Sequence, residues 1–310
     1  MVRSRRVSPG IRFFPVMAIG LFAAGCGGNG GDATLADGMI AVADVGLLSP
    51  RAVIHDPVAD VYLVTNVNGP NMAEDQNGFV SRIAPDGTVQ NLTWIAPSAA
   101  ASALHSPTGI AIRGDSLYVA DLGCIGVFNR ESGEAVERTC MDGVSSISGL
   151  DVGPEGSLFL TDSGFETGTG GMVSSGTAAV YRLVIGDDRR GSTLAQGSDL
   201  GHPMGLAVGS RGIFVVTSDP GQVLRLTADG QRTTVLSAPN SDFEGVVFVG
   251  DGGFAYSSSS DSTVYHVDGQ GAVHPVLTGV SSPGDLGYDA TRNRLLVPLT
   301  SENRVVFVDL

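Results

Sequence analysis

Short runs of alternating apolar and polar residues fill most of the chain, and each run ends near glycine, proline or aspartate. Such alternation is typical of half-buried β-strands. The runs form a repeat that can be aligned on the first apolar residue after each turn, namely Val53, Ile110, Leu150, Leu206, Val246 and Leu286. The intervals between these positions are 57, 40, 56, 40 and 40 residues. This spacing indicates a repeat of about 40 residues with two insertions of about 16 residues each.

Each unit opens with a turn, as in SPRAV, SPTGI and HPMGL, and continues into an apolar second strand such as VYLVTN or SLYVAD. Two further strands follow, joined in several units by tight hairpins at Asp86-Gly87, Asp229-Gly230 and Asp268-Gly269. This pattern predicts an all-β fold, a six-bladed β-propeller with four-stranded blades. The last unit has only three strands, so we expect an N-terminal strand at Met39–Val45 to complete the last blade and close the ring.

The first 26 residues have the pattern of an export signal. An arginine-rich start precedes the apolar run Phe13–Ala24, which is too short to span a bilayer and suits a signal peptide. The segment Ala23-Ala24-Gly25-Cys26 resembles a bacterial lipobox, so we expect lipidation of Cys26; an ordinary signal peptide with an incidental cysteine is the alternative.

These features predict a signal peptide at 1–25, a flexible tether at 26–37 and the propeller at 38–310. We therefore expect an exported, lipid-anchored protein of the bacterial cell envelope. Position 27 is glycine and not the aspartate that is associated with retention in the inner membrane. We therefore expect the protein in the outer membrane, facing the periplasm or the cell surface.

The formal net charge of −14 argues against binding to nucleic acid, because such a surface repels phosphates. All 18 basic residues are arginine, which excludes Schiff-base chemistry and a lysine general base. We expect a monomer whose partners are the membrane, through the lipid, and a small molecule or an envelope protein.

Two further cysteines, Cys124 and Cys140, lie in one predicted hairpin of the second blade. Their midpoint is residue 132, where the hairpin turns, so the two residues should lie opposite each other. An exported protein permits a disulfide here, and two buried free thiols are the alternative.

The segments SPRAVIHDPVADVYLVTNVNG, SPTGIAIRGDSLYVAD and SPGDLGYDATRNRLLVPLTSENRVVFVDL resemble the gluconolactonase, senescence-marker-protein and luciferin-regenerating-enzyme superfamily. The likeness covers nearly all of 48–310. Within the superfamily, the chain is similar to a bacterial lipoprotein subgroup of unknown function. NHL-repeat and strictosidine-synthase-like propellers share the same spacing. The resemblance implies a six-bladed propeller, and for the lactonases it implies a divalent metal at the channel mouth, held by carboxylate and asparagine side chains.

At the matching positions this chain departs from the metal-binding pattern. Arg51 is the nearest polar residue where the first blade should supply an acid, and Met204 replaces an asparagine. Only Glu244 keeps a charge suited to a metal, so we expect an ion pair between Arg51 and Glu244 and a metal chemistry that is absent or rebuilt. The predicted ligand-binding positions at the channel mouth are Arg51, Thr108, Ser148, Met204, Glu244 and Asp285.

Three other groups are candidates for chemistry. His105 and His202 precede inner strands and could act with Glu244 as general bases, although turn packing is the alternative. The oxygen-rich loop that contains Asn66, Asp75 and Asn77 could bind Ca²⁺, although a solvated loop with turn-capping side chains is the alternative. The glycine-rich segment 163–176 lacks the features of a phosphate-binding loop and predicts a flexible loop on the rim of one face.

Two functional hypotheses follow from these features. The first is an envelope-anchored lipoprotein that binds a ligand or a protein partner on one propeller face, without the metal-dependent catalysis of the superfamily. The alternative is a lactone or ester hydrolase with a remodelled site at the central channel, either metal-free or with Ca²⁺.

Overall fold

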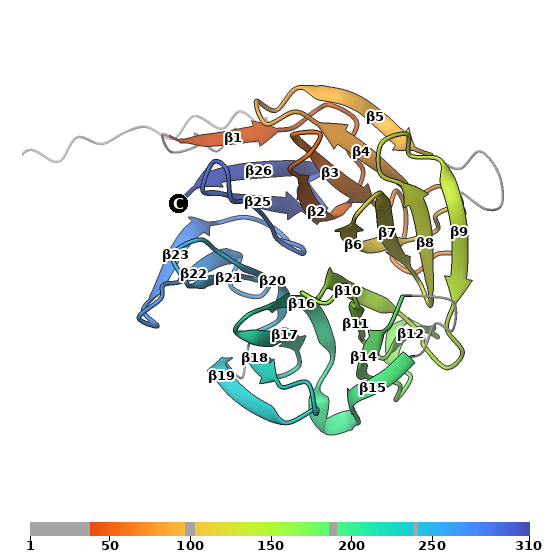
Figure 1. The fold of residues 1–310 in the computed structure, drawn as a ribbon, viewed down its shortest axis with the longest axis vertical. Helices are drawn as coiled ribbons and strands as arrows, with labels where there is room; N and C mark the ends of the chain where they lie inside the picture. Colours follow the sequence, from red (N-terminus) through yellow and green to blue (C-terminus); the bar gives the residue numbers. More distant parts are fainter. Residues whose placement is uncertain (1–37, 97–102, 186–190, 239–240) are drawn as a thin grey trace, which may run out of the picture. The chain divides into compact units, whose positions relative to one another are not determined.

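Residues 38–96, 103–185, 191–238 and 241–310 are described by the structure, a computed structural model. The predicted signal peptide, the tether and Cys26 lie outside these residues. In the described part of the chain, every strand except one hairpin belongs to one of six four-stranded antiparallel sheets arranged in a ring (Figure 1). No helix in this part is long and apolar enough to cross a bilayer. The predicted six-bladed propeller is confirmed.

Within blades 1 to 5 the strands run in chain order from the channel outward, and in blade 6 the N-terminal strand is outermost. Blade 1 consists of β2 (Pro50–Asp56), β3 (Val61–Asn66), β4 (Phe79–Ile83) and β5 (Val89–Ile95). Blade 2 consists of β6 (Pro107–Arg113), β7 (Ser116–Asp121), β8 (Cys124–Asn129) and β9 (Ala135–Cys140). Blade 3 consists of β10 (Ile147–Val152), β11 (Leu158–Asp162), β14 (Ala179–Leu183) and β15 (Gly191–Gln196).

The second half of the ring repeats this arrangement. Blade 4 consists of β16 (Pro203–Gly209), β17 (Gly212–Ser218), β18 (Gly221–Leu226) and β19 (Arg232–Ala238). Blade 5 consists of β20 (Phe243–Phe248), β21 (Phe254–Ser258), β22 (Thr263–Val267) and β23 (Val273–Thr278). Blade 6 consists of β24 (Gly287–Asp289), β25 (Arg294–Leu299), β26 (Arg304–Asp309) and the N-terminal β1 (Met39–Val42).

The ring closes where β1 pairs with β26, with Met39 opposite Val308 and Val42 opposite Val305 (Figure 1). This closure was predicted, but the strand ends at Val42 rather than Val45. Asp44 adopts a positive φ of 58°, which is incompatible with a continued strand.

Apolar residues on facing sheets form the core between successive blades. Leu63 and Val80 of blade 1 pack in one buried cluster with Leu117 and Val119 of blade 2. Equivalent clusters connect the other blades around the ring. The hydrophobic alternation in the sequence therefore corresponds to sheet-on-sheet packing along the ring.

Glycines allow the inner strands to approach one another closely around the channel. A methyl group on Gly149 of β10 would lie 2.6 Å from the carbonyl oxygen of Met204 in the next blade. A methyl group on Gly245 of β20 would lie 2.6 Å from the Cα atom of Asp285. Both contacts are too short for a side chain, so the glycine in the repeated turn motif is needed for the backbone contact between blades.

The predicted disulfide between Cys124 and Cys140 is confirmed, and the two residues are directly paired across β8 and β9. The hairpins predicted at Asp86-Gly87 and Asp229-Gly230 are present, with Gly87 and Gly230 at positive φ. The hairpin after Asp268 closes a three-residue loop with the same hydrogen bonds as the other two, but its residue at positive φ is Gly271, so Asp268-Gly269 begins the turn instead of ending it.

The insertion in blade 3 was predicted as a flexible loop, and this is wrong for most of it. It forms a two-stranded hairpin of β12 (Phe165–Gly168) and β13 (Gly171–Ser174). Glycines around the turn, including Gly170 at φ 96°, permit the tight connection, and Phe165, Glu166 and Thr167 pair in register with β13.

Candidate functional site

A β-bulge near the start of the inner strand determines which side chain of each blade enters the channel mouth. In blades 1 to 5 the register shifts directly after the first residue pair of that strand, for example between Pro50 and Val53 and between Phe243 and Val246. Bulges re-aim side chains. The first residue inside each of the five shifts lines one cavity, and these residues are Arg51, Thr108, Ser148, Met204 and Glu244.

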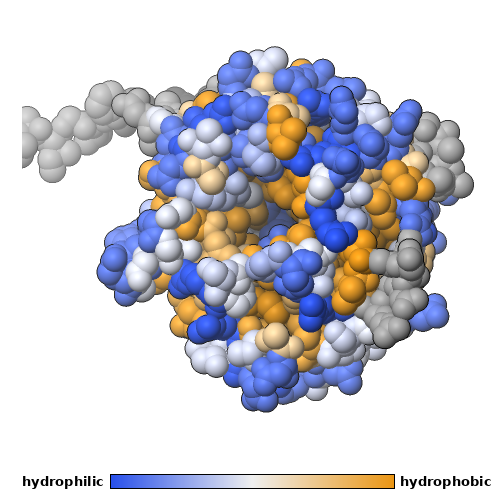
Figure 2. Space-filling model, in the orientation of Figure 1, coloured by the Kyte–Doolittle hydropathy of each residue, from blue (hydrophilic) through white to orange (hydrophobic). Residues whose placement is uncertain are grey.

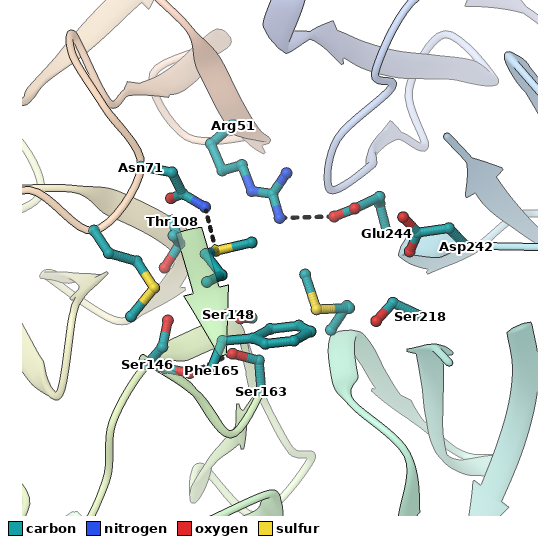
Figure 3. A pocket seen from close by; sticks show the side chains of 13 residues that line it. Arg51, Asn71, Thr108, Ser146, Ser148, Ser163, Phe165, Ser218, Asp242 and Glu244 are labelled. Atoms are coloured by element: carbon teal, nitrogen blue, oxygen red, sulfur yellow. Dashed lines mark hydrogen bonds and ion pairs between the residues drawn. The ribbon is translucent and has the colours of Figure 1, made fainter. Parts of the chain in front are cut away.

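This channel-mouth cavity has a volume of about 160 Å³. Figure 2 shows the face hollowed at its centre, with apolar residues around the hollow. The remaining lining comes from turns at strand ends and from two insertions, the β3–β4 connection and the β12–β13 hairpin (Figure 3). It consists of Asn71, Met72, Ser146, Ser163, Phe165, Met172, Ser218 and Asp242. The wall therefore combines hydroxyl groups, thioethers and one aromatic ring with a few charges.

The two insertions contact each other over this cavity. The side-chain amide of Asn71, in the β3–β4 connection, lies 3.5 Å from the sulfur of Met172 on β13 (Figure 3). The backbone N–H of Met72 donates to the hydroxyl of the buried Ser106, which fixes the loop against blade 2. The insertions thus form the outer wall of the cavity.

The expected ion pair between Arg51 and Glu244 is present, with a distance of 2.7 Å between Nη2 and Oε2 (Figure 3). The two side chains are 18% and 12% exposed and join blade 1 to blade 5 across the channel mouth. A partly buried, charge-assisted hydrogen bond of this kind is stronger than a neutral one.

The donor set does not fit the divalent metal that the resemblance implies. Glu244 is the only carboxylate at the five bulge positions, and a guanidinium already occupies one of its oxygens. The hydroxyl of Thr108 donates to the carbonyl oxygen of Ile147 at 2.6 Å, and Met204 offers only a thioether. Hard dications prefer several oxygen ligands, so we derive no metal-dependent step.

Asp242 is a site residue that the sequence analysis missed. It lines the cavity beside Glu244, and its Oδ1 atom is buried without a hydrogen-bond partner among the described residues (Figure 3). Burial raises the pKa of Asp242 to about 6, and the carboxylate of Glu244 adds to this effect while Arg51 opposes it. Its position two residues before Glu244 was the only available signal.

Asp285 was predicted to bind ligand, but it is not among the residues that line the cavity. Its carboxylate points toward blade 4, where a methyl group on Gly205 would lie 2.7 Å from Oδ1. Burial raises the pKa of Asp285 to about 8; Arg51 opposes this shift, and the carboxylates of Asp151 and Glu244 add to it. Asp285 therefore shapes the electrostatics beneath the cavity.

His202 and His105 do not join Glu244 in a catalytic group. The ring of His202 stacks on Phe165 with centroids 3.9 Å apart, and its Nδ1 lies 2.7 Å from the carbonyl oxygen of Ser163. His105 lines a second, neighbouring cavity instead. His202 therefore has a packing role, which was the alternative expectation.

The proposed Ca²⁺ loop residues also have other partners. Asn66 is fully buried; it accepts the N–H of Leu48 and donates to the hydroxyl of Ser81 within blade 1. Asp75 and Asn77 bond to each other, with 2.8 Å between Oδ2 and Nδ2. These contacts match the expected turn-capping loop and do not bring the three residues to one point.

One cluster of histidine and acidic residues was not anticipated. His55, Asp60 and Asp289 have ligand atoms within 4.8 Å of one another at the seam between blades 1 and 6. Arg292 binds both acids, at 2.7 Å from Asp60 and 2.8 Å from Asp289, and Tyr62 donates to Asp289 at 2.7 Å. An arginine in this position makes the cluster an ion-pair network rather than a metal site.

No family model and no curated protein sequence matches the chain. Solved structures do match it. A gluconolactonase of Xanthomonas campestris is 20% identical, with a TM-score of 0.59 over 83% of this chain and 93% of that chain. An auxiliary nutrient binding protein of Bacteroides thetaiotaomicron is 11% identical, with a TM-score of 0.62 over 84% and 69%.

A streptogramin B lyase is 10% identical, with a TM-score of 0.61 over 87% of this chain and 96% of that chain. Identities this low establish a common fold and leave the chemistry to the residues of the site. The chain is therefore a six-bladed propeller with the fold of the gluconolactonase-like proteins, as its sequence pattern suggested.

Proposed function

We propose that this protein binds a small molecule in the channel-mouth cavity, without metal-dependent catalysis, while a lipid on Cys26 anchors it in the bacterial envelope. The channel-mouth cavity is concave and mixes apolar with a few polar side chains, as small-molecule sites do, and one neighbour in fold is described as a nutrient binding protein. Its lining offers apolar contacts from Phe165 and Met204 and hydroxyl groups from several blades.

The observation that carries this proposal is the unpartnered Oδ1 of Asp242. Buried polar atoms are nearly always hydrogen-bonded, so an exception inside a cavity marks a position for a ligand donor or an ordered water. The neighbouring Glu244 is held by Arg51, which leaves Asp242 as the carboxyl group available to a ligand.

The test is a thermal-shift screen of the purified protein against monosaccharides, amino acids and aliphatic amines, followed by calorimetric titration of each compound that raises the melting temperature. We expect at least one such compound to bind about tenfold or more weakly to Asp242→Asn, because a hydrogen bond to a charged group contributes roughly 1.5–3 kcal/mol. Asp115→Asn is the matched control, since Asp115 lies in the exposed β6–β7 turn outside the cavity. Binding that is unchanged in Asp242→Asn would refute the assigned site.

A hydrolase remains the second candidate because Asp242, whose pKa is about 6, lies beside Glu244 in a cavity. A carboxyl group with a raised pKa next to an ionised one is suited to general acid–base catalysis. The same preparation, incubated with a panel of lactones, separates the two functions: turnover that is lost in both Asp242→Asn and Glu244→Gln would favour the hydrolase.

The anchoring part of the proposal has its own readout. In a bacterial host, mass spectrometry of the mature N-terminus should find a lipid on Cys26, and Cys26→Ser should release the protein from membranes. An unmodified Cys26 would contradict the anchor and leave the ligand site untouched.

A further inference from the structure

A second cavity lies next to the channel-mouth cavity and extends the site outward. It has a volume of about 510 Å³, and Met72 lines both cavities. The outer cavity runs over the rim of blade 2 between the two insertions, and its walls include Glu74, His105, Arg138 and Glu166. The inner cavity alone holds only part of a drug-sized ligand, whereas the two together reach the usual size of a binding site, about 300–1,000 Å³.

Each cavity carries an excess of negative charge. In the inner one, Arg51 matches Glu244, so the charge of Asp242 is left over. In the outer one, Arg138 bonds to the buried Asp121 at 2.7 Å, and Asp121 does not line the cavity.

The carboxylates of Glu74 and Glu166 line the outer cavity from opposite insertions. Neither forms an ion pair or a side-chain hydrogen bond with another residue in the part of the chain that the structure describes. The outer cavity therefore has two acids that its arginine does not balance.

Each cavity also contains one buried polar atom that lacks a hydrogen-bond partner among the described residues. These atoms are Oδ1 of Asp242 in the inner cavity and Nδ1 of His105 in the outer one. A carboxylate oxygen only accepts hydrogen bonds, and the ring nitrogen of a neutral histidine can accept one. In the tautomer that carries its hydrogen on Nε2, His105 presents an acceptor, and both cavities then lack a donor.

The wall between these two polar regions is apolar and adaptable. Met72 lines both cavities, and Met172 and Phe165, from the insertion in blade 3, line the inner one. Thioether side chains are flexible and polarisable, so they can pack along an alkyl chain of variable length.

We infer that the two cavities form one site for a linear aliphatic diamine or polyamine, with one ammonium group at Asp242, the methylene chain along Met72, and the second ammonium group between Glu74 and Glu166. An ammonium group has three donors and no acceptor, which complements a site of unpaired carboxylates and an acceptor nitrogen. The inference rests on the proposed binding function and names the chemical class of its ligand.

The experiment is calorimetric titration of the purified protein with 1,4-diaminobutane and spermidine, compared with n-butylamine and 1,4-butanediol. We expect both polyvalent amines to bind about tenfold or more tightly than butylamine, and the uncharged diol not to bind. Affinity should fall as salt is added, because Glu74 and Glu166 are exposed.

Two variants assign the two ends of the site. Asp242→Asn should weaken the diamine and abolish binding of butylamine, whereas Glu74→Gln with Glu166→Gln should weaken only the polyvalent amines by about tenfold. Asp115→Asn is the control for general attraction to an acidic surface. Equal binding of the diamine to all these variants would overturn the inference.

The outcome also separates this inference from the proposed function. If no amine binds but a sugar or amino acid does, and its affinity falls in Asp242→Asn, the ligand class is wrong and the binding function stands. If the diamine responds to Asp242→Asn but not to the Glu74 and Glu166 double variant, the outer cavity is not part of the site.

Discussion

At the residue scale, the channel mouth contains more acid than base. Arg51 pairs with Glu244, whereas Asp242 and Asp285 experience the same arginine only through space. Burial therefore dominates, and both carboxyl groups hold their protons at higher pH than usual. The protonation state of these two residues links the channel to the pH of the medium.

The stability of the folded protein should fall as pH rises from about 4 to about 8. The pKa of Asp285 is about 8 in the folded protein, against an ordinary value of 3.8, so the folded state keeps a proton that the unfolded state has lost. The stabilisation is complete below pH 4 and disappears as pH rises through 8. We expect the melting temperature to decline between pH 6 and pH 8, and Asp285→Asn to flatten this part of the profile.

The pKa values of Asp151 and Asp242 are both raised to about 6, so these residues change the stability mainly below pH 6. Above pH 6 the decline is then due to Asp285. Differential scanning calorimetry at several pH values measures the effect, with Asp115→Asn as the control. A decline that persists unchanged in Asp285→Asn would contradict the assignment.

Five of the six residues predicted at the channel mouth do line the cavity. They could be predicted because each blade repeats the same turn and strand, so that alignment places one residue of each blade at the mouth. Asp242 could not be found in this way, since it lies outside the aligned position. The sequence left His202 open between a general base and turn packing, because nothing in it shows that Phe165, in an insertion, stacks on the ring.

At the scale of elements, hydroxyl groups connect alternate blades to their neighbours. Thr161 of β11 accepts the N–H of Gly149 at 2.8 Å and donates to the carbonyl oxygen of Met204 in the next blade. Thr65 and Ser257 bridge blades 1 and 5 to their neighbours in the same manner. Each hydroxyl is fully buried and satisfies backbone groups that the β-bulge leaves unpaired.

Thr161→Val should therefore destabilise the protein by roughly 1–3 kcal/mol, because it leaves a buried N–H and a buried carbonyl without partners. This corresponds to a fall of about 2–4 °C in melting temperature per kcal/mol for a large domain. Thr233→Val, on the exposed outer strand β19, is the control and should change little. Equal effects of the two substitutions would show that the bridge contributes nothing.

The number and order of strands in each blade followed from alternation and spacing, because the pattern depends only on which face of each strand is buried. The bulges did not, since a shifted register near Pro107 or Pro203 leaves no mark in the hydrophobic pattern. The glycine of SPTGI and HPMGL was read as a turn residue, yet its structural role is contact between inner strands.

At the scale of the whole molecule, blade 1 and blade 6 are fastened by polar contacts as well as by β1. Asp289 is fully buried and accepts hydrogen bonds from Tyr62 of blade 1 and from Arg292. Burial alone would raise the pKa of Asp289, but the hydrogen bonds from Arg292 and Tyr62 outweigh it and lower the pKa below 3.8.

Asp289→Asn should destabilise the fold by about 1–3 kcal/mol, because it removes the buried carboxylate charge that accepts hydrogen bonds from Tyr62 and Arg292, while one amide oxygen still accepts and Arg292 keeps Asp60. The contribution of Asp289 is present above pH 4 and is lost as pH falls through its lowered pKa, so the difference between variant and wild type should shrink in acid.

Asp60→Asn provides the matched control in the same network, since Asp60 is 52% exposed and contacts the same arginine. Chemical denaturation of both variants at pH 7 and pH 3 measures the difference. Similar losses for the two variants would show that the seam depends on Arg292 alone.

The pairing of β1 with β26 joins the first strand of the ring in chain order to the last one. Until Val305–Val308 have left the ribosome, Met39–Val42 have no partner strand, and the sixth blade cannot be completed. A chain truncated before Val305 would keep every inner strand of the channel and still fail to close. Synthesis of β26 is thus required before the ring can close, and a chain that lacks it is left with an open strand edge that quality-control proteases can recognise.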